Sequence, residues 1–475
     1  MLRTNVKRTR YSIVGLGKLG ASMAAAITGR GFDVIGVDVD AAVVETVNAG
    51  RAPVSETGLA DAIEINRARL SATANHSEAV AHSDVTFIIV PTPSDRTGMF
   101  SLQYASYAFR EIGRGLAGKE DYHLVVLTST VVPGSTRQVL LPQLEAASGK
   151  KCGCDFGICY SPEFIALGSV IRDFLNPDFT LVGEFDQRSG ALLERCYAEI
   201  VENGAPCKRM SIENAELTKL AVNTFVTTKI AYANMLAELC EGIPGGDVDV
   251  VTDALGADKR IGRRYLTGGL GFGGPCFPRD NIALSAFGRH VGAAPDIAVV
   301  TDASNSVPVR RLVEQVGAAV RPKSTVAVLG LAYKPQSHVI ERSQGLEAAL
   351  AIAGTGIRVV CYDPLARDAA RNEVKDKALV LDNIKACLDQ ADVVVIANPD
   401  PEFARLTSED FPQRSPPIQV IDCWRLLRAQ LEGSAHVRYR AVGVAGDVGD
   451  ALVRIWQPAT RPHGVRILRD QDIAV

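Results

Sequence analysis

Cys276 follows a glycine-rich stretch, and this combination of residues suits covalent chemistry. Five glycines occupy the seven positions 268–274, Cys276 stands two residues further on, and Arg279 follows it. Glycine leaves the backbone free to fold closely around a ligand. A thiol attacks as its thiolate, which nearby cations or N–H groups stabilise; Arg279 and Lys219 are candidates. The residues alone leave two interpretations open: a nucleophilic cysteine, or a buried structural cysteine after a flexible loop.

A second pattern, near the N-terminus, predicts a dinucleotide site. Gly15, Gly17 and Gly20 form a GxGxxG run between a strand-like and a helix-like segment. Such glycines permit a tight turn, a close backbone approach to a pyrophosphate and close helix–strand packing, while the helix N-terminus attracts phosphate. Asp38 stands where a carboxylate accepts hydrogen bonds from ribose hydroxyls and repels a 2′-phosphate, so we expect NAD rather than NADP. The alternative is a glycine-rich turn with no ligand.

The remaining cysteines predict no metal site. Ten cysteines are scattered through the chain, and Cys152, Cys154 and Cys159 lie close together, but no second CxxC or histidine pair completes a zinc site. We expect free thiols in a reducing, cytoplasmic setting.

The elements that position the glycine run are strands alternating with helices. Residues 11–15 and 33–38 are strand-like and flank a helix predicted at 18–29. Further strand-like segments at 85–90 and 124–128 favour a doubly wound parallel sheet.

The pattern changes in the middle of the chain. Residues 211–241 contain no glycine or proline and predict one long helix that begins near Ser211, suited to a spine between domains or a subunit interface. Strand-like segments resume at 325–329, 358–362, 393–397 and 418–422, with proline-rich loops at 399–401 and 412–417. We therefore predict two doubly wound α/β domains, 1–207 and 311–475, joined by a helical region, 208–310.

Composition excludes several classes of protein. The 475 residues are 47% hydrophobic and 22% charged, with a formal net charge of -3, so nucleic-acid binding is not expected. No apolar run approaches the roughly 18–20 residues that span a membrane. The segment 1–10 is basic, but we interpret the apolar residues after it as the first strand rather than a signal peptide.

Taken together, the motifs resemble those of the UDP-glucose/GDP-mannose dehydrogenase family over essentially the full length. The matching pieces are Gly15–Gly20, Thr128–Val131, Ser161–Phe164, Lys219–Asn223 and Gly271–Asp280. The resemblance implies two Rossmann-like domains around a central helical dimerisation region. It also implies NAD, a nucleotide-sugar substrate, most simply a UDP-hexose, and a homodimer with its interface on the helix 211–241.

The resemblance implies a four-electron oxidation of a primary alcohol to a carboxylate. Cys276 would capture the intermediate aldehyde, because an enzyme that oxidises twice must retain it between the steps. Lys219 and Asn223, four residues apart on one helical face, would stabilise negative charge on the reacting oxygen. Asp280, Thr130 and Glu163 would position or activate the hydrolytic water.

The binding residues are likewise implied by the resemblance. For the cofactor they are Gly15, Gly17, Lys18, Leu19, Gly20, Asp38, Thr92 and Thr130. For the substrate they are Phe164, Lys219, Asn223, Arg260, Phe272, Gly273, Lys334 and Arg342, with Arg260 acting across a dimer contact.

Four of these residues also have plainer interpretations. Lys219 and Asn223 suit the surface of a helix. Glu163 suits the N-terminal turn of a helix, where its charge favours the dipole. Asp280 suits the cap of a helix that starts near Asn281.

The segment 333–343 departs from the family pattern. Where many members carry an acidic pair, this chain has His338 and Val339, and the usual Arg-Glu order is reversed to Glu341 and Arg342. Arg279 replaces a frequent lysine and keeps its charge. The redox residues stay intact, whereas the identity of the sugar nucleotide is left open. Two other functions are weighed: a two-electron dehydrogenase of the β-hydroxyacid type, and a non-catalytic protein that binds NAD or a sugar nucleotide.

Overall fold

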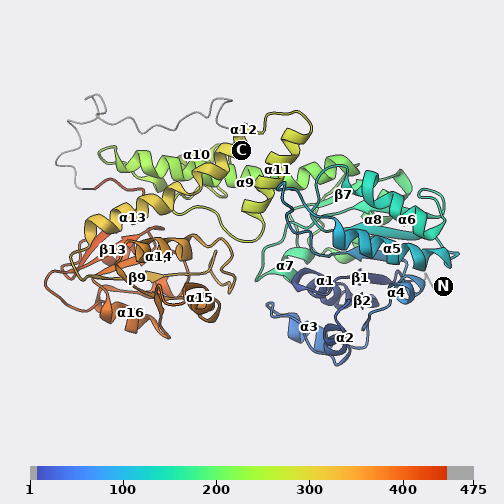
Figure 1. The fold of residues 1–475 in the computed structure, drawn as a ribbon, viewed down its shortest axis with the longest axis horizontal. Coiled ribbons are helices and arrows are strands. Elements are labelled where there is room, and N and C mark those ends of the chain that lie inside the picture. Colours follow the sequence, from blue (N-terminus) through green and yellow to red (C-terminus); the bar gives the residue numbers. More distant parts are fainter. Residues whose placement is uncertain (1–7, 447–475) are drawn as a thin grey trace.

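The structure, a computed structural model, describes residues 8–446 as two α/β domains connected by a long helix (Figure 1). Residues 1–7 and 447–475 lie outside the described residues. They include most of the basic segment 1–10 and the outer ends of the predicted domains 1–207 and 311–475.

The first domain contains an eight-stranded sheet in the order β3-β2-β1-β4-β5-β6-β7-β8. Its strands are β1 (Tyr11–Val14), β2 (Val34–Val37), β3 (Leu70–Thr73), β4 (Val85–Ile88), β5 (His123–Leu127), β6 (Phe156–Tyr160), β7 (Thr180–Glu184) and β8 (Cys207–Ser211). Its helices are α1 (Lys18–Gly29), α2 (Ala41–Asn48), α3 (Leu59–Ile65), α4 (His76–His82), α5 (Gln103–Ala117), α6 (Leu141–Ser148), α7 (Val170–Leu175) and α8 (Gln187–Ile200). All neighbouring strands are parallel except β6 and β7, so the sheet is mixed at that point.

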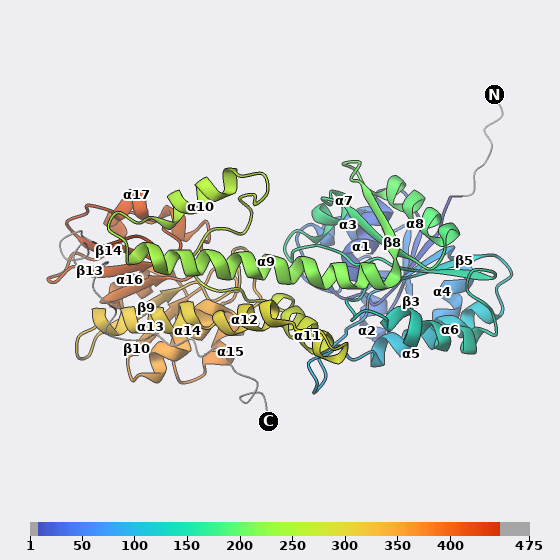
Figure 2. The ribbon, with the colours of Figure 1, turned by 90° about the horizontal axis from the view of Figure 1, so that it is seen from above.

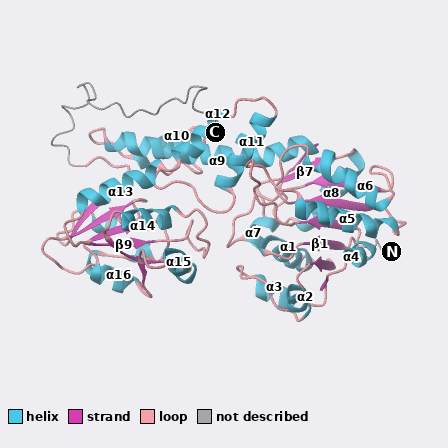
Figure 3. Ribbon diagram, viewed as in Figure 1, coloured by secondary structure: helices cyan, strands magenta, loops and turns pink. Residues whose placement is uncertain are grey.

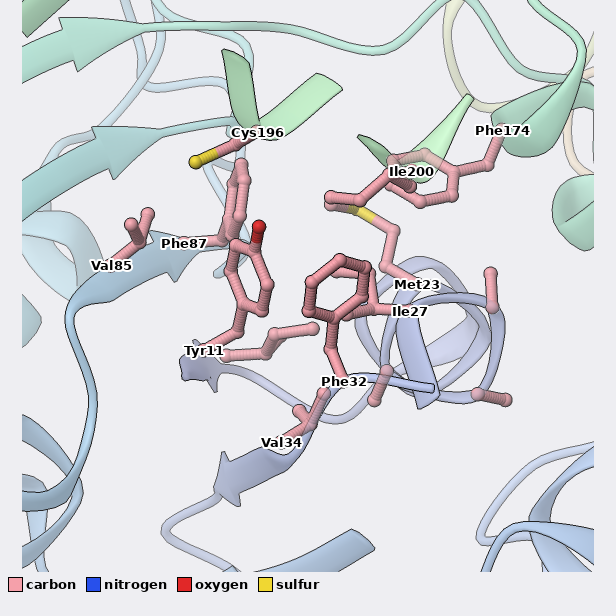
Figure 4. Close-up of a cluster of buried hydrophobic side chains, with 14 of the residues drawn as sticks. Tyr11, Met23, Ile27, Phe32, Val34, Val85, Phe87, Phe174, Cys196 and Ile200 are labelled. Atoms are coloured by element: carbon pink, nitrogen blue, oxygen red, sulfur yellow. The ribbon is translucent and has the colours of Figure 1, made fainter. Parts of the chain in front are cut away.

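Helices cover both faces of this sheet, which explains why its strands are apolar throughout (Figure 3). On the α1 face, Tyr11 packs edge-on against Phe32 at 5.4 Å between ring centroids and stacks against Phe87 at 6.2 Å (Figure 4). The alanines of α1 are small enough to bring that helix close to β1, and they are buried there.

The strand order reverses between β1 and β4, because the chain fills one side of the sheet before returning to the other. In doubly wound sheets such a reversal opens a binding place at the carboxyl ends of the two strands. Gly15 follows β1 at this place, as the GxGxxG run predicts.

The helix α9 (Ile212–Glu241) runs from the first domain to the second (Figure 2). Ser211 caps it by accepting a hydrogen bond from the Asn214 N–H. Its 30 residues span about 45 Å. Beside it lie α10 (Val248–Ala257), α11 (Phe277–His290), α12 (Asp296–Ser304) and α13 (Val307–Ala319), which leads into the second domain.

The second domain contains a six-stranded parallel sheet in the order β11-β10-β9-β12-β13-β14. Its strands are β9 (Thr325–Leu329), β10 (Arg358–Tyr362), β11 (Leu379–Val380), β12 (Val393–Ile396), β13 (Ile418–Asp422) and β14 (Val437–Ala441). Its helices are α14 (Gln344–Gly354), α15 (Arg367–Val374), α16 (Ile384–Gln390) and α17 (Arg428–Leu431). The reversal recurs between β9 and β12.

The predicted fold class is confirmed, and the predicted strands and helices start or end within two residues of the observed ones. Within residues 8–446, no helix combines the length and apolar composition needed to cross a membrane. The same residues contain no group of His, Cys, Asp and Glu side chains able to hold a metal ion.

Candidate active site

The glycine run at the end of β1 has the geometry that a dinucleotide requires. Gly15 has a φ of 96°, and Gly20 lies so close that a Cβ there would overlap the carbonyl oxygen of Gly15. Apart from Gly17 itself and its chain neighbours, no described atom lies within 4 Å of the position a Cβ would take on this residue, the N-cap of α1, so the space in front of the helix is open. The backbone therefore fits a pyrophosphate at this point.

The start of α1 is electrostatically free to receive an anion. No side chain caps its first N–H groups, and its first turn, from Lys18 and Leu19 onward, contains no acid. Asp38 lies beside it: its carboxylate accepts hydrogen bonds from the Leu16 N–H at 2.8 Å and the Asp40 N–H at 3.0 Å. Each oxygen keeps a second lone pair for a ribose hydroxyl.

Cys276 stands at the N-cap of α11, where the glycine-rich loop ends. Its side chain is accessible, yet the surrounding protein displaces enough water to raise the pKa of the thiol, and the charge of Asp280 raises it further. Lys219 and Arg279 oppose this rise. Because α11 begins at Phe277, Asp280 lies in its first turn, so the expectation that Asp280 caps a helix starting near Asn281 is wrong.

Lys219 does not face solvent, which overturns its plainer interpretation. Its side chain is buried, its Nζ donates to the carbonyl oxygen of Glu163 at 2.6 Å, and it lies 4.7 Å from the ring centroid of Phe164. Burial lowers the pKa of Lys219, while the charges of Asp280, Cys276 and Glu163 hold it up. A buried cation held among three acidic groups suits proton transfer.

Asn223 is buried as well, and it is tied to Asp280. Its Nδ2 donates to Oδ2 of Asp280 at 2.6 Å, and only 1% of Asp280 is exposed. Within the described residues, the other oxygen of Asp280 has no hydrogen-bond partner. Burial raises the pKa of Asp280 against the lowering effect of Lys219. The orphaned oxygen is suited to bind a water molecule or a substrate hydroxyl.

Glu163 lies in the loop after β6 rather than in a helix, so its interpretation as a helix N-terminal acid is also wrong. Burial raises the pKa of its carboxyl group to about 7, against the lowering effect of Lys219. The Tyr197 hydroxyl of α8 donates to Oε1 of Glu163 at 3.4 Å and shares a 2.7 Å hydrogen bond with Ser161. A carboxyl group of this kind exchanges protons readily at neutral pH.

Thr130 and Thr92 lie on neighbouring loops at the same sheet edge. The Thr92 hydroxyl donates to the backbone carbonyl oxygen of Thr130 at 2.7 Å. This bond does not involve the Thr130 hydroxyl. Arg279 donates to the Thr92 carbonyl oxygen at 3.3 Å and lies 4.9 Å from the centroid of the Phe100 ring. Arg279 thus links the cysteine helix to the loops of the first domain.

Sequence reasoning missed three residues that hold this site together. Glu216 of α9 accepts from the Gly134 N–H at 2.6 Å and from the Thr136 N–H at 2.9 Å, which fixes the loop after Thr130. Its place on the Lys219 face of the helix was the available signal. Asn234 and Asn305 each form a pair of hydrogen bonds with the glycine-rich loop, for which the sequence offered no signal.

Most of the predicted substrate residues gather around this cluster. Phe164 packs against Phe179 beside Lys219, and Phe272 and Gly273 lie in the glycine-rich loop, buried. Tyr333 packs against Gly274, and burial together with the charge of Cys276 raises the pKa of its hydroxyl to about 12. Burial lowers the pKa of the adjacent Lys334, near Asp173 and Glu56 of the first domain.

Of the two remaining predicted arginines, Arg342 lies against the glycine-rich loop, because a Cβ added to Gly273 would overlap the Arg342 carbonyl oxygen. Arg342 has a φ of 51°, and Asp302 and Glu347 are the carboxylates that feel its charge. The Arg260 side chain is 87% exposed and pairs with Asp258 at 2.6 Å. The binding roles of both arginines stay predictions.

These features define a class of enzyme: a dehydrogenase with one open dinucleotide site and a second α/β domain whose loops meet a cysteine and a buried lysine. The sequence matches the UDP-glucose/GDP-mannose dehydrogenase family in three parts. These are its NAD binding domain at residues 9–201, its central domain at 213–307 and its UDP binding domain at 327–429. The chain belongs to this family, so it is an NAD-dependent nucleotide-sugar 6-dehydrogenase.

Named relatives differ in their sugar nucleotide. The chain is 37% identical to a UDP-glucose 6-dehydrogenase of Haloferax volcanii over 84% of its length and 93% of the relative's. It is 34% identical to a GDP-mannose 6-dehydrogenase of Azotobacter vinelandii over 90% of its length and 99% of the relative's. Among solved structures, a UDP-glucose dehydrogenase from Pyrobaculum islandicum superposes with a TM-score of 0.82 at 33% identity, covering 94% of this chain and 100% of that one.

Proposed function

We propose that the enzyme oxidises the C6 primary alcohol of a nucleotide-linked hexose, a UDP-hexose in the first instance, to the uronic acid through a thioester on Cys276. The observation that carries this proposal is the convergence of Cys276, Lys219, Asn223 and Asp280 at the junction of the domains. The regions 1–207, 208–310 and 311–475 then hold the cofactor, the catalytic helix and cysteine, and the nucleotide of the substrate.

In the first oxidation, the alcohol loses a proton and a hydride to become an aldehyde. NAD, held by the glycine run of the first domain, would supply the hydride acceptor. Lys219 lies near Asp280, Cys276 and Glu163, and burial lowers its pKa. As the neutral amine it takes the proton of the alcohol, and the ammonium group so formed stabilises negative charge on the substrate oxygen. Asn223 donates to the same oxygen with its amide group.

In the second oxidation, the Cys276 thiolate attacks the aldehyde carbon and forms a thiohemiacetal, which retains the intermediate. Loss of the hydroxyl proton and of a second hydride, for which a second NAD would supply the acceptor, gives the thioester. Lys219 and Arg279 supply the positive charge that favours the thiolate, against the effect of burial and of Asp280.

Hydrolysis releases the acid and the free thiol. A water molecule attacks the thioester carbon and needs a base for its proton. The Glu163 carboxyl group, with its pKa near 7, and the orphaned oxygen of Asp280 are the candidate bases, and the Thr130 hydroxyl positions the water.

In this proposal, the predicted binding residues divide between the cofactor and the substrate. Gly15, Gly17, Lys18, Leu19 and Gly20 hold the NAD pyrophosphate, Asp38 the ribose, and Thr92 and Thr130 the nicotinamide side. Phe164, Phe272, Gly273, Lys334 and Arg342 hold the sugar nucleotide. The description of the matched third part as a UDP binding domain and the Haloferax volcanii relative favour UDP, whereas the Azotobacter vinelandii relative keeps GDP as the competitor.

We also infer a cytoplasmic homodimer with its interface on α9. This helix leaves Phe225 66% exposed, and the neighbouring α12 leaves Ile297 73% exposed. An apolar cavity of about 540 Å³ lies between α9, α12 and α13, lined by Tyr232, Met235 and Val300 among others. A second copy would cover this face and would offer Arg260 a site that it does not reach in its own chain.

The first experiment counts NADH released per molecule of substrate over UDP-, GDP-, ADP- and CDP-linked hexoses and N-acetylhexosamines. Two NADH with one donor would support the proposal and name the substrate. One NADH would indicate a two-electron dehydrogenase. NAD binding without turnover on any donor would indicate a non-catalytic protein.

Replacing the thiol tests the covalent route. In Cys276→Ser, we expect acid formation to fall by roughly 10³-fold or more, because a nucleophile is lost, while NADH affinity is unchanged. Cys154→Ser, at an exposed cysteine, is the matched control. Mass spectrometry of quenched enzyme should detect the acylated thiol in the wild type only. Undiminished carboxylate production by the variant contradicts the covalent route.

A further inference from the structure

His338 of the second domain reaches the cofactor loop of the first. Its Nε2 lies 2.7 Å from Nζ of Lys18, the first residue of α1. An ammonium group only donates, so Nε2 accepts this bond and the ring proton is on Nδ1. The imidazole thus keeps one N–H to donate, beside the uncapped N-terminus of α1.

The loop that carries His338 is fixed in place. The Tyr333 N–H donates to the carbonyl oxygen of Val339 at 3.0 Å, and the Gln336 N–H donates to Asp400 at 3.1 Å. The loop also abuts the first domain, because a Cβ added to Gly168 would lie 3.3 Å from the carbonyl oxygen of Gln336. Hydrogen bonds within the loop and its contact with the first domain therefore hold His338 beside Lys18.

The charges around this contact favour an anion. Among the described residues, no carboxylate forms an ion pair with Lys18, and α1 has neither a side-chain cap nor an acid in its first turn. The other basic side chains of the 333–343 segment are engaged elsewhere: Lys334 lies near Asp173 and Glu56, and Arg342 near Asp302 and Glu347. His338 is the group of this segment that meets the phosphate-binding end of α1.

We propose that His338 binds the pyrophosphate of the dinucleotide from the second domain, so that the cofactor is held between the Lys18 ammonium, the α1 N–H groups and the His338 imidazole. The contact would be a feature of this chain, because many members of the family carry an acid at the position of His338. Bound cofactor would then join the two domains directly.

The cofactor and the nucleotide-sugar substrate each contain a diphosphate, so the experiment measures the two kinds of ligand separately. Affinities for NADH, ADP-ribose, UDP and GDP are measured by fluorescence or calorimetry on the intact enzyme without turnover. In His338→Ala we expect the Kd for NADH and ADP-ribose to rise about tenfold, the order of one hydrogen bond to a charged group. The Kd for UDP or GDP should stay within about twofold of wild type, a range that corresponds to less than about 0.5 kcal/mol.

Further variants fix the sign of the effect. His338→Arg should bind NADH at least as tightly as wild type, and His338→Asp should bind it more weakly than His338→Ala. His436→Ala, at an exposed imidazole of the second domain, is the matched control. Thermal unfolding checks that the variants fold.

Two outcomes would overturn the proposal: NADH affinities that are equal across the series, or a loss confined to UDP or GDP, which would assign the imidazole to the substrate diphosphate. The failure of the thioester route would leave this test unaffected, because no reaction is run.

Discussion

Gly15 in the first domain and Gly330 in the second occupy the same place in their sheets. Each follows the strand at which the strand order reverses, with a φ of 96° and 103° respectively. Each lies under a helix glycine, Gly20 or Gly345, where a Cβ would overlap its carbonyl oxygen. The N–H of the next residue donates to an aspartate at the end of the neighbouring strand in both domains.

We call each of these arrangements a frame: the glycine after the strand, the helix glycine above it and the aspartate beside it. The two frames differ at the helix N-terminus, where an anion would bind. The helix α1 starts without a cap, whereas Ser343 caps α14 by accepting from the Leu346 N–H, and Glu347 places a negative charge in its first turn. Asp38 accepts two protein hydrogen bonds, whereas the buried Asp363 accepts four. The same backbone frame therefore forms a dinucleotide site in one domain and a closed structural unit in the other.

From this difference we predict that the second domain binds its nucleotide through loops and not through a helix N-terminus. Tyr333 and Lys334 lie in the segment between β9 and α14, which replaces the short glycine run of the first domain. Exchanging equivalent residues in the two frames should separate stability from cofactor binding.

The largest effect is expected at the aspartates. Asp363→Ala should destabilise the second domain by about 4 kcal/mol, because four N–H groups lose their acceptor at about 1–3 kcal/mol for each one left unsatisfied in the interior. Asp38→Ala should lower the free energy of unfolding of the first domain by about 1 kcal/mol. It should also shift the preference for NAD over NADP by about tenfold toward NADP. Urea unfolding and the ratio of kcat/KM for the two cofactors measure these effects. An unchanged cofactor ratio in Asp38→Ala would remove that carboxylate from the ribose site.

The glycines should give a smaller and more even loss of stability. Gly20→Ala and Gly345→Ala each force a Cβ against a carbonyl oxygen, which typically costs about 1–3 kcal/mol. Only Gly20→Ala should also lose NADH affinity, because it moves the open end of α1. Equal NADH binding by the two variants would mean that the cofactor site tolerates the shift of α1. The two domains would then not differ in the role of this glycine.

The smallest effect is expected at the cap. Ser343→Ala should destabilise the second domain by about 1 kcal/mol and leave NADH affinity unchanged. Ser306→Ala is the matched control, because Ser306 stands at the N-cap of α13 without a side-chain cap hydrogen bond and should cost less. A loss of NADH affinity in Ser343→Ala alone would show that the segment before α14 is coupled to the cofactor site.

In the first domain, the sequence predicted both the strands and the glycine turn, whereas in the second domain it predicted only the strands. The spacing of the glycines explains this difference. Gly15 and Gly20 are five residues apart and form a readable motif, whereas Gly330 and Gly345 are fifteen apart, so the same geometry leaves no motif. Lys219, Asn223 and Asp280 were predicted because they sit in short motifs. Glu216 could have been found from its place on the Lys219 face of α9. Tyr197 and the pairing of Lys18 with His338 act through tertiary contacts between distant segments, which periodicity and local spacing do not report.

The length of α9 matters as much as its composition. Asn223 at the Asp280 contact and Asn234 at the glycine-rich loop are eleven residues apart, about three full turns, so both side chains project from nearly the same side of one rod. Inserting or deleting a single residue between them would rotate one end against the other by about 100° and shift it by about 1.5 Å. The number of residues between the two asparagines therefore sets the position of the glycine-rich loop relative to Asp280.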